Sequence, residues 1–183
     1  MRALIITWEN FQDQELIYPY YRLREVANSP EDIVIMANVI GKFFGIMGVN
    51  MESHALISDL SNIEKVNYYI ENYDLLVIPG GVKALEKLRQ EKQVILFIAA
   101  WNNKKKIIAS TCHGAQLMIS AKITSGKRIS GYYSIEDDIS NSGAVYVNEP
   151  VVVDGNIVSS PHYNWMGEWM NTAINLVKKN DIN

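Results

Sequence analysis

The single cysteine of the chain, Cys112, stands where a thiol could act as a nucleophile. It follows the apolar run "IIAST" and precedes "HGAQLMISA", which has the character of a helix start. Ser110 and Gly114, two positions to either side, are small enough for the sharp strand-to-helix turn that carries a nucleophile. A thiol that faces a helix N-terminus has a lowered pKa, because the helix dipole favours the thiolate. The pattern predicts a nucleophilic cysteine, with a small buried hydrophobe as the alternative.

Two glycines are predicted to lie near this thiol. In an open α/β sheet, ligands bind beyond the carboxyl ends of the strands. Gly80 and Gly81 come directly after the apolar run "LLVI", where a missing side chain lets the backbone approach a substrate and offer an N–H to an oxyanion. The alternative is that they form only a turn.

A carboxyl group is expected at the same edge. Glu15 opens a predicted helix beyond the first apolar run. If ionised, it would raise the pKa of Cys112 by like-charge repulsion, whereas a protonated form could donate a hydrogen bond to the thiolate. We expect the second arrangement, with one shared proton; a first-turn acid that only complements the helix dipole is the alternative. His113 is the obvious general base, although adjacent residues of a helix point apart.

The elements that must position these groups are short strands alternating with helices. The predicted strands are unbroken apolar runs, which suit a parallel sheet buried on both faces: Ala3–Thr7, Ile33–Ala37, Leu75–Ile78 and Ile107–Ala109. One helix is predicted from about Gln14, with Pro19 in its first turns or at a kink, and another over "KALEKLRQEKQVILFIAAW". This alternation predicts a doubly wound α/β sandwich.

The C-terminal third predicts a hairpin and a last helix. "EPVVVDGNIVSS" predicts a β-hairpin with a type I′ turn at Asp154-Gly155. The last helix repeats large apolar residues, which indicates a core or a subunit contact: Trp165, Met166, Trp169, Met170, Ile174 and Val177. "GKFFGIMG" lacks the ending of a phosphate-binding loop, so no nucleotide role is assigned to it.

Composition narrows the classes of function. A length of 183 residues predicts one domain over 1–183. The net charge of −3 does not indicate the basic surface that binds nucleic acid. One cysteine excludes an internal disulfide and, with three scattered histidines, does not suggest a zinc site, so no metal or cofactor is expected. The N-terminal apolar run is too short for a signal peptide, and no run approaches a membrane span. We expect a cytoplasmic protein without membrane contact.

Several motifs resemble, in order and spacing, the PfpI-type intracellular cysteine peptidases of the ThiJ/PfpI superfamily. They are "ENFQDQELIYPYYRL", "DLLVIPGG", "STCHGAQLMISA", "SGYYSIEDDISNSGAVYV" and "EPVVVDGNIVSS". The resemblance implies a flavodoxin-like sandwich, a reactive Cys112 beside His113, an oxyanion hole from the amides of Gly81 and His113, and an acid at Glu15. It also implies homodimers or hexamers in which a glutamate from a neighbouring subunit completes a triad.

The chain departs from this family at several positions. Gln12 stands where the family often has a second acid, and a gapless match puts Leu85 at the intersubunit glutamate, so that only a one-residue shift brings Glu86 there. Tyr132 matches a tyrosine near the family's active site, with a purely structural role as the alternative; Gly80 and Tyr132 are predicted to contact the substrate. After "SSP" the chain is shorter than the usual family segment, so one wall of the pocket is expected to differ.

A related class, the class I glutamine amidotransferases, uses an elbow cysteine with a later His-x-Glu pair. Here His162 is followed by Asn164 where the glutamate should stand, so His162 is predicted to be a surface or packing residue. His54 has no identifiable partner and is predicted to be structural.

The leading hypothesis is a cysteine hydrolase for small peptides or amides, in which Cys112 attacks the carbonyl and His113, with Glu86 of a partner, moves protons. The resemblance also allows a glutathione-independent glyoxalase or deglycase that uses Cys112 and Glu15 on a small carbonyl substrate. A third hypothesis is a redox or stress sensor in which Cys112 is oxidised. A binding module without turnover is the last.

Overall fold

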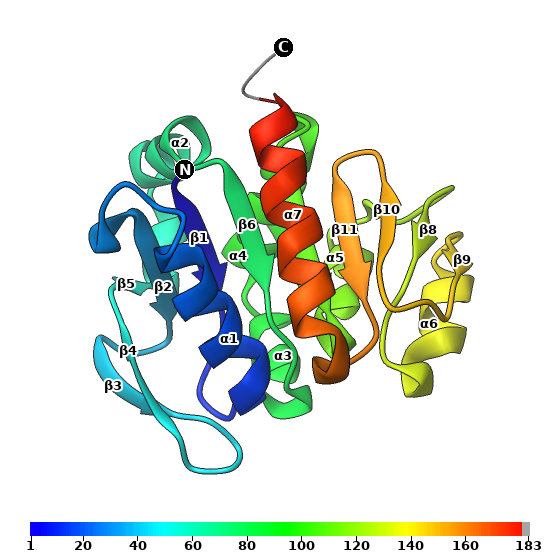
Figure 1. Cartoon of the computed structure of the whole chain (residues 1–183), viewed down its shortest axis with the longest axis horizontal. Coiled ribbons are helices and arrows are strands. Elements are labelled where there is room, and N and C mark those ends of the chain that lie inside the picture. The colour runs from blue at the N-terminus through cyan, green and yellow to red at the C-terminus, as the bar shows by residue number, and fades with distance from the viewer. Residues whose placement is uncertain (181–183) are drawn as a thin grey trace.

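A single seven-stranded sheet organises the chain, in the order β10-β11-β7-β6-β1-β2-β5 (Figure 1). The structure is a computed structural model and describes residues 1–180; the last three residues of the predicted domain lie outside this range. All neighbouring strands are parallel except β10 and β11, which form an antiparallel hairpin. The strands are β1 (Ala3–Ile6), β2 (Ile33–Ala37), β5 (Ala55–Leu56), β6 (Leu75–Ile78), β7 (Ile107–Thr111), β10 (Val152–Asp154) and β11 (Ile157–Ser160).

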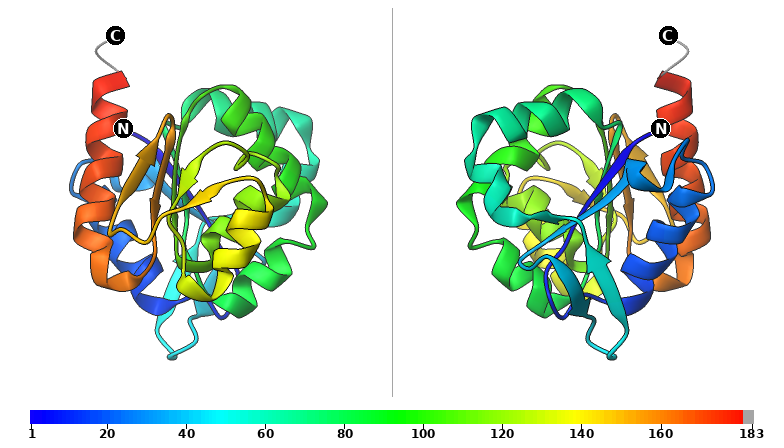
Figure 2. Two further views of the ribbon diagram at one scale, coloured as in Figure 1. Left: turned by 90° about the vertical axis from the view of Figure 1, so that its right-hand side faces the viewer. Right: turned by 90° about the vertical axis from the view of Figure 1, so that its left-hand side faces the viewer.

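Helices cover both faces of the sheet (Figure 2). Helices α1 and α7 lie on one face, and α2 to α5 lie on the other. The helices are α1 (Asp13–Arg24), α2 (Ile63–Asn72), α3 (Val82–Leu88), α4 (Lys92–Asn103), α5 (Ala115–Ser120), α6 (Glu136–Asn141) and α7 (Met166–Asn180). Five of the parallel strands run in the order β2-β1-β6-β7-β11, which is the flavodoxin-like order, and the short β5 is added parallel to β2 at the edge. The predicted fold class is confirmed.

The central strands are apolar because both of their faces are buried. All four residues of β1 and of β6 are fully buried, and so are most of those in β7. Two shorter pairs lie outside the main sheet: β3 (Gly41–Phe44) with β4 (Asn50–Ser53), and β8 (Arg128–Ile129) with β9 (Val145–Tyr146). The segment "GKFFGIMG" therefore forms a strand and the tip of a hairpin.

The segment predicted as one helix over 83–101 forms two helices, α3 and α4, so this prediction is wrong. Leu88 and Val94 are both fully buried, yet they are six positions apart. At 3.6 residues per turn, one straight helix would point these two side chains in different directions. The break between the helices lets each of them turn an apolar face to the sheet.

The hairpin between β10 and β11 has its turn one residue later than predicted. Asp154 pairs with Ile157, which leaves Gly155 and Asn156 as the turn. Gly155 has a φ of 60°, whereas Asn156 is not in the positive-φ region. A type I′ turn needs positive φ at both residues, so that prediction is wrong; a glycine with positive φ at the first position is typical of type II′.

Helices α1 and α7 differ in detail from their predictions. Helix α1 begins at Asp13, and Pro19 lies in its middle, where it offers no N–H to the carbonyl of Glu15 one turn earlier. In α7 the predicted apolar residues are buried except Trp165, which precedes the helix and is 37% exposed. Trp169 donates its Nε1–H to the carbonyl of Val158, 3.2 Å away in β11. The stripe from Met166 onward is core.

No helix within residues 1–180 is both long and apolar enough to cross a membrane. The cytoplasmic location and the homodimer or hexamer stay predictions.

Candidate active site

Cys112 lies in a strained turn directly after the last residue of β7. Its φ of 57° lies in the left-handed region, which few residues other than glycine adopt. A short 3₁₀ turn, Cys112–Gly114, then leads into α5. A Cβ on Gly114 would lie 2.7 Å from both the carbonyl oxygen of Ile78 and the Oγ of Ser110. The close approach of strand and helix expected of a nucleophile elbow is therefore present.

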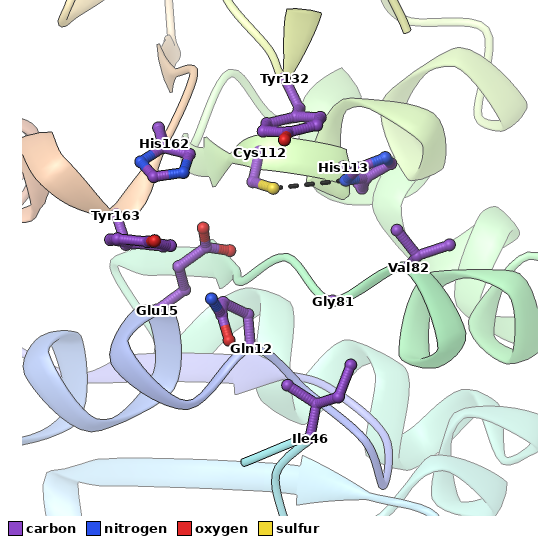
Figure 3. Close-up of a pocket in the computed structure, with 10 residues that line it drawn as sticks. All are labelled: Gln12, Glu15, Ile46, Gly81, Val82, Cys112, His113, Tyr132, His162 and Tyr163. Atoms are coloured by element: carbon purple, nitrogen blue, oxygen red, sulfur yellow. Dashed lines mark hydrogen bonds between the residues drawn. The ribbon is translucent and has the colours of Figure 1, made fainter. Parts of the chain in front are cut away.

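His113 reaches the thiol although it is the next residue in the chain. Its Nδ1 lies 3.3 Å from the Sγ of Cys112 (Figure 3). The two side chains converge because Cys112 is not in a helical conformation, so the rule for neighbours in a helix does not apply. The Nε2 of His113 lies 3.4 Å from the Oγ of Ser134, and its ring centroid lies 5.0 Å from that of Tyr132. Burial lowers the pKa of His113, against the charge of Asp138, which raises it.

Glu15 lies on α1 and is fully buried. Its Oε2 accepts a hydrogen bond of 2.8 Å from the N–H of Gly80, and its Oε1 has no hydrogen-bond partner among the described residues. Burial raises the pKa of Glu15 from 4.5 to about 7, and hydrogen bonds from Gly80 and Cys112 oppose that rise. In Figure 3 the carboxyl points toward the thiol. A carboxyl with this pKa exchanges protons readily near neutral pH.

The pKa of the thiol is raised, which differs from the lowering predicted from the helix dipole. Burial is the largest cause, and the charge of Glu15 adds to it. The backbone N–H groups of His113 and Gly81 hydrogen-bond to the sulfur and lower the pKa, but they do not outweigh burial. Two negative charges in one buried site repel each other, so these shifts disfavour the state in which Cys112 and Glu15 are both ionised.

Gly80 is tightly enclosed by this pair. A Cβ on Gly80 would lie 2.2 Å from the Oε2 of Glu15, 2.7 Å from the Cβ of Cys112 and 3.1 Å from its Sγ. Only a glycine lets the backbone N–H reach the carboxyl while the thiol stays in place.

We predict that Gly80→Ala destabilises the protein by about 1–3 kcal/mol and disrupts the thiol–carboxyl pair, because the added methyl overpacks a filled site. Urea unfolding and the rate of Cys112 alkylation measure the two effects. Gly167→Ala is the matched control, because its nearest contact would be the Tyr18 hydroxyl at 3.7 Å. Equal behaviour of the two variants would contradict the prediction.

A cavity of about 290 Å³ opens over the thiol. Ten residues from six segments of the chain line it: Gln12, Glu15, Ile46, Gly81, Val82, Cys112, His113, Tyr132, His162 and Tyr163 (Figure 3). Five of the predicted site residues are among them, and Gly80 lies behind Glu15, bonded to its carboxyl.

Glu86 does not line this cavity. It is exposed on α3, while Leu85, the gapless match to the family's intersubunit glutamate, is fully buried. Within one chain, neither residue provides an acid for His113. Whether a second copy brings Glu86 to the cavity stays a prediction.

Part of the cavity wall comes from a residue that the sequence did not place in the site. His162 was predicted to be a surface or packing residue, yet it lines the cavity, with its ring centroid 5.9 Å from that of Tyr132 and 3.8 Å from that of Tyr163. Its position after β11 is the signal that could have found it. Strand β11 lies beside β7, so residues that follow the two strands meet at one edge of the sheet.

The hairpin of β3 and β4 supplies the opposite wall through Ile46. Asp13, at the start of α1, is buried and accepts hydrogen bonds from the N–H groups of Met47 at 2.9 Å and Val49 at 3.0 Å. These bonds fasten the hairpin tip to the helix that carries Glu15. His54, predicted to be structural, accepts from the N–H of Ile35 at 3.0 Å and does not line the cavity. No group of three or more His, Cys, Asp or Glu side chains that could hold a metal ion occurs within residues 1–180.

A flavodoxin-like sheet with an elbow cysteine beside a buried glutamate defines the class of this protein. The model of the DJ-1/PfpI family matches residues 1–176, and the chain belongs to that family. This confirms the resemblance found in the sequence. A deglycase of Pyrococcus abyssi is 36% identical over 178 residues, which are 97% of this chain and 100% of the relative.

Two further relatives extend the comparison. The Bacillus subtilis protein named "Putative cysteine protease YraA" is 32% identical, over 96% of this chain and 97% of its own length. The solved structure of a ThiJ/PfpI domain protein from Brachyspira murdochii superposes with a TM-score of 0.85 at 20% identity, covering 97% of this chain and 96% of that one. At this identity the structural likeness supports the fold alone.

Proposed function

We propose that the protein is a cysteine-dependent enzyme that acts on small dicarbonyl compounds and their adducts with amines, as a glyoxalase or deglycase. The observation that carries this proposal is the fully buried Glu15 beside Cys112, both within reach of a Cβ on Gly80, in an environment that raises the pKa of each. We take the two groups as a proton-sharing pair. The names of relatives such as the Pyrococcus abyssi deglycase support the same class of reaction.

The site supplies the groups that each step needs. With the shared proton on Glu15, the thiolate of Cys112 attacks the aldehyde carbon of methylglyoxal and forms a C–S bond. The new oxyanion is held by the N–H groups of Gly81 and His113 and takes the proton of Glu15, which gives a hemithioacetal. For an amine adduct, the thiolate displaces the amine: the C–S bond forms, the C–N bond breaks, and the amine takes the proton of Glu15, which gives the same hemithioacetal.

The second half of the reaction reverses the role of Glu15. As a carboxylate it removes the hydrogen of the former aldehyde carbon and, as an acid, returns a proton to the neighbouring carbon. The hydroxyl proton of the first carbon moves to the oxygen of the second, which leaves a lactoyl thioester on Cys112. Water then hydrolyses the thioester and releases lactate and the thiol. The sum is methylglyoxal plus water to lactate, with no external oxidant or reductant.

The cavity favours substrates without negative charge. Among the described residues, no Lys or Arg side chain lines it, and Glu15 is the acid within it. An anionic substrate would meet no cation to offset its desolvation. Aromatic rings of Tyr132, His162 and Tyr163 form an apolar wall suited to small neutral molecules.

A hydrolase of small peptides or amides is the second candidate. The observation in its favour is the 3.3 Å contact between His113 Nδ1 and the thiol, together with the two N–H groups at the sulfur. The name of YraA supports it as well. In this reaction His113, and not Glu15, protonates the leaving amine.

Two assays distinguish the candidates. We expect the wild type to release lactate from methylglyoxal and from its amine adducts, with much lower kcat/KM for the anionic aldehyde glyoxylate, and with little release of dye from peptide anilides. Glu15→Gln should remove the first activity. Turnover of anilides that survives Glu15→Gln but is lost in His113→Gln would instead establish the hydrolase.

A further inference from the structure

Both ring nitrogens of His113 have a hydrogen-bond partner. Nδ1 lies 3.3 Å from the Sγ of Cys112, and Nε2 lies 3.4 Å from the Oγ of Ser134. A neutral imidazole carries a hydrogen on only one of its two ring nitrogens, so that nitrogen donates a hydrogen bond and the other accepts one. Burial favours the neutral ring by lowering the pKa of His113. Which nitrogen faces the thiol as an acceptor depends on the partner at the other one.

We propose that Ser134 is the positioning residue for His113: its Oγ accepts the Nε2–H, leaves Nδ1 as an acceptor for the proton that Cys112 and Glu15 share, and completes a Cys–His–Ser relay within one chain. This inference rests on the proposed function and names a member of the same site. A nucleophile, a base and a third group that orients the base form the general pattern of such sites.

The backbone holds Ser134 at a fixed place relative to the elbow. Ser134 lies in the 3₁₀ turn Tyr133–Ile135, directly after Tyr132. The N–H of Tyr132 donates to the carbonyl of Cys112 at 3.2 Å, and a Cβ on Gly131 would lie 3.4 Å from that same carbonyl. The ring of Tyr132 packs against that of His113, with centroids 5.0 Å apart. The segment that carries Ser134 is thus bonded to the residue whose proton it helps to move.

The relay does not require an acid from a second subunit. Glu86 is exposed on α3 and does not line the cavity, and the charge that acts on His113 within the chain is that of Asp138 on α6. A serine hydroxyl orients a neutral ring without adding a buried charge, whereas a carboxylate would stabilise the imidazolium. A hydroxyl suits a site in which Glu15 already shares the proton of Cys112.

The test uses Ser134→Ala, with Ser134→Thr to restore the hydroxyl. Ser140→Ala, at an exposed serine of α6 that does not line the cavity, is the control, and Glu86→Gln tests for an acid from a second subunit. Ser134 is exposed, so loss of its hydroxyl is not expected to unfold the protein. We expect the ¹⁵N chemical shifts of His113 in the wild type to show a protonated Nε2 and an unprotonated Nδ1. In Ser134→Ala the ring should become a mixture of tautomers, and kcat should fall about tenfold with KM nearly unchanged. Ser134→Thr should restore both.

The opposite results would overturn the proposal. One is a His113 tautomer that is the same in Ser134→Ala as in the wild type. The other is that Glu86→Gln changes the tautomer and lowers kcat as much as is expected for Ser134→Ala. The nitrogen shifts need no turnover. A wild type without activity on any carbonyl substrate would therefore refute the proposed function while the role of Ser134 is still decided by the shifts.

Discussion

Cys112→Ser will lower kcat/KM for methylglyoxal and for its amine adducts by about 10³-fold or more, because every proposed step begins with the thiolate. The hydroxyl of serine is a much weaker nucleophile than a thiolate. Lactate release at pH 7.5, followed with each substrate, measures the loss. A variant that keeps more than about a tenth of the activity would contradict the role of Cys112.

A matched control lies two residues away. Ser110→Ala also alters a buried side chain at the end of β7, but the hydroxyl that it removes has no hydrogen-bond partner among the described residues. We expect this variant to keep its activity. If both variants lost activity together, the effect would come from the packing of the elbow and not from the thiol.

Glu15→Gln will stabilise the folded protein at pH 8 by about 3 kcal/mol and leave it nearly unchanged at pH 4 to 5. The folded protein holds the proton of Glu15 up to a pKa of about 7, whereas the unfolded chain releases it near the ordinary value of 4.5. Between these values the wild type loses about 1.4 kcal/mol of unfolding free energy with each pH unit, and above pH 7 the loss is complete. A glutamine never ionises, and its oxygen still accepts from the N–H of Gly80.

Urea unfolding at pH 4.5 and pH 8 measures this difference. Asp13→Asn is the control, because Asp13 is a buried carboxyl of the same helix that accepts two backbone N–H groups with its two oxygens. An asparagine has only one acceptor oxygen, so this variant should be less stable than the wild type. A gain in Glu15→Gln of equal size at both pH values would show that packing, not charge, is responsible.

Glu15→Gln should also remove activity, and this loss together with the gain in stability bears on the role of Glu15. A carboxyl that costs stability above neutral pH is a group whose environment favours a proton, and that is what an acid–base partner for a thiol requires. Stability gained together with activity lost would show that Glu15 is placed for chemistry and not for folding.

The parts of the fold that the sequence predicts are those decided by local pattern. The runs Leu75–Ile78 and Ile107–Ala109 are buried on both faces, so each is apolar throughout and recognisable as a parallel strand. The elbow is recognisable because backbone crowding at Gly114 excludes a side chain. Glu15 and Gly80 could be placed near Cys112 because residues that follow parallel strands share one edge of the sheet.

What the sequence did not predict depends on contacts between distant segments. His162 lies 50 positions after Cys112, and no local pattern shows that its ring packs on Tyr132. The direction of the thiol pKa also depends on tertiary structure, because burial and Glu15 outweigh the nearby N–H groups. Ser134 is an ordinary residue of a turn until the position of the His113 ring is known.

The measurement that tests the central claim most directly is the rate of Cys112 alkylation by iodoacetamide between pH 4 and pH 11, in the wild type and in Glu15→Gln. A shared proton predicts two inflections in the wild type, because Cys112 and Glu15 titrate as a pair, and a single inflection in the variant. The same profile in both proteins, or a thiol that reacts only after denaturation, would contradict the account and leave Cys112 as a buried packing residue.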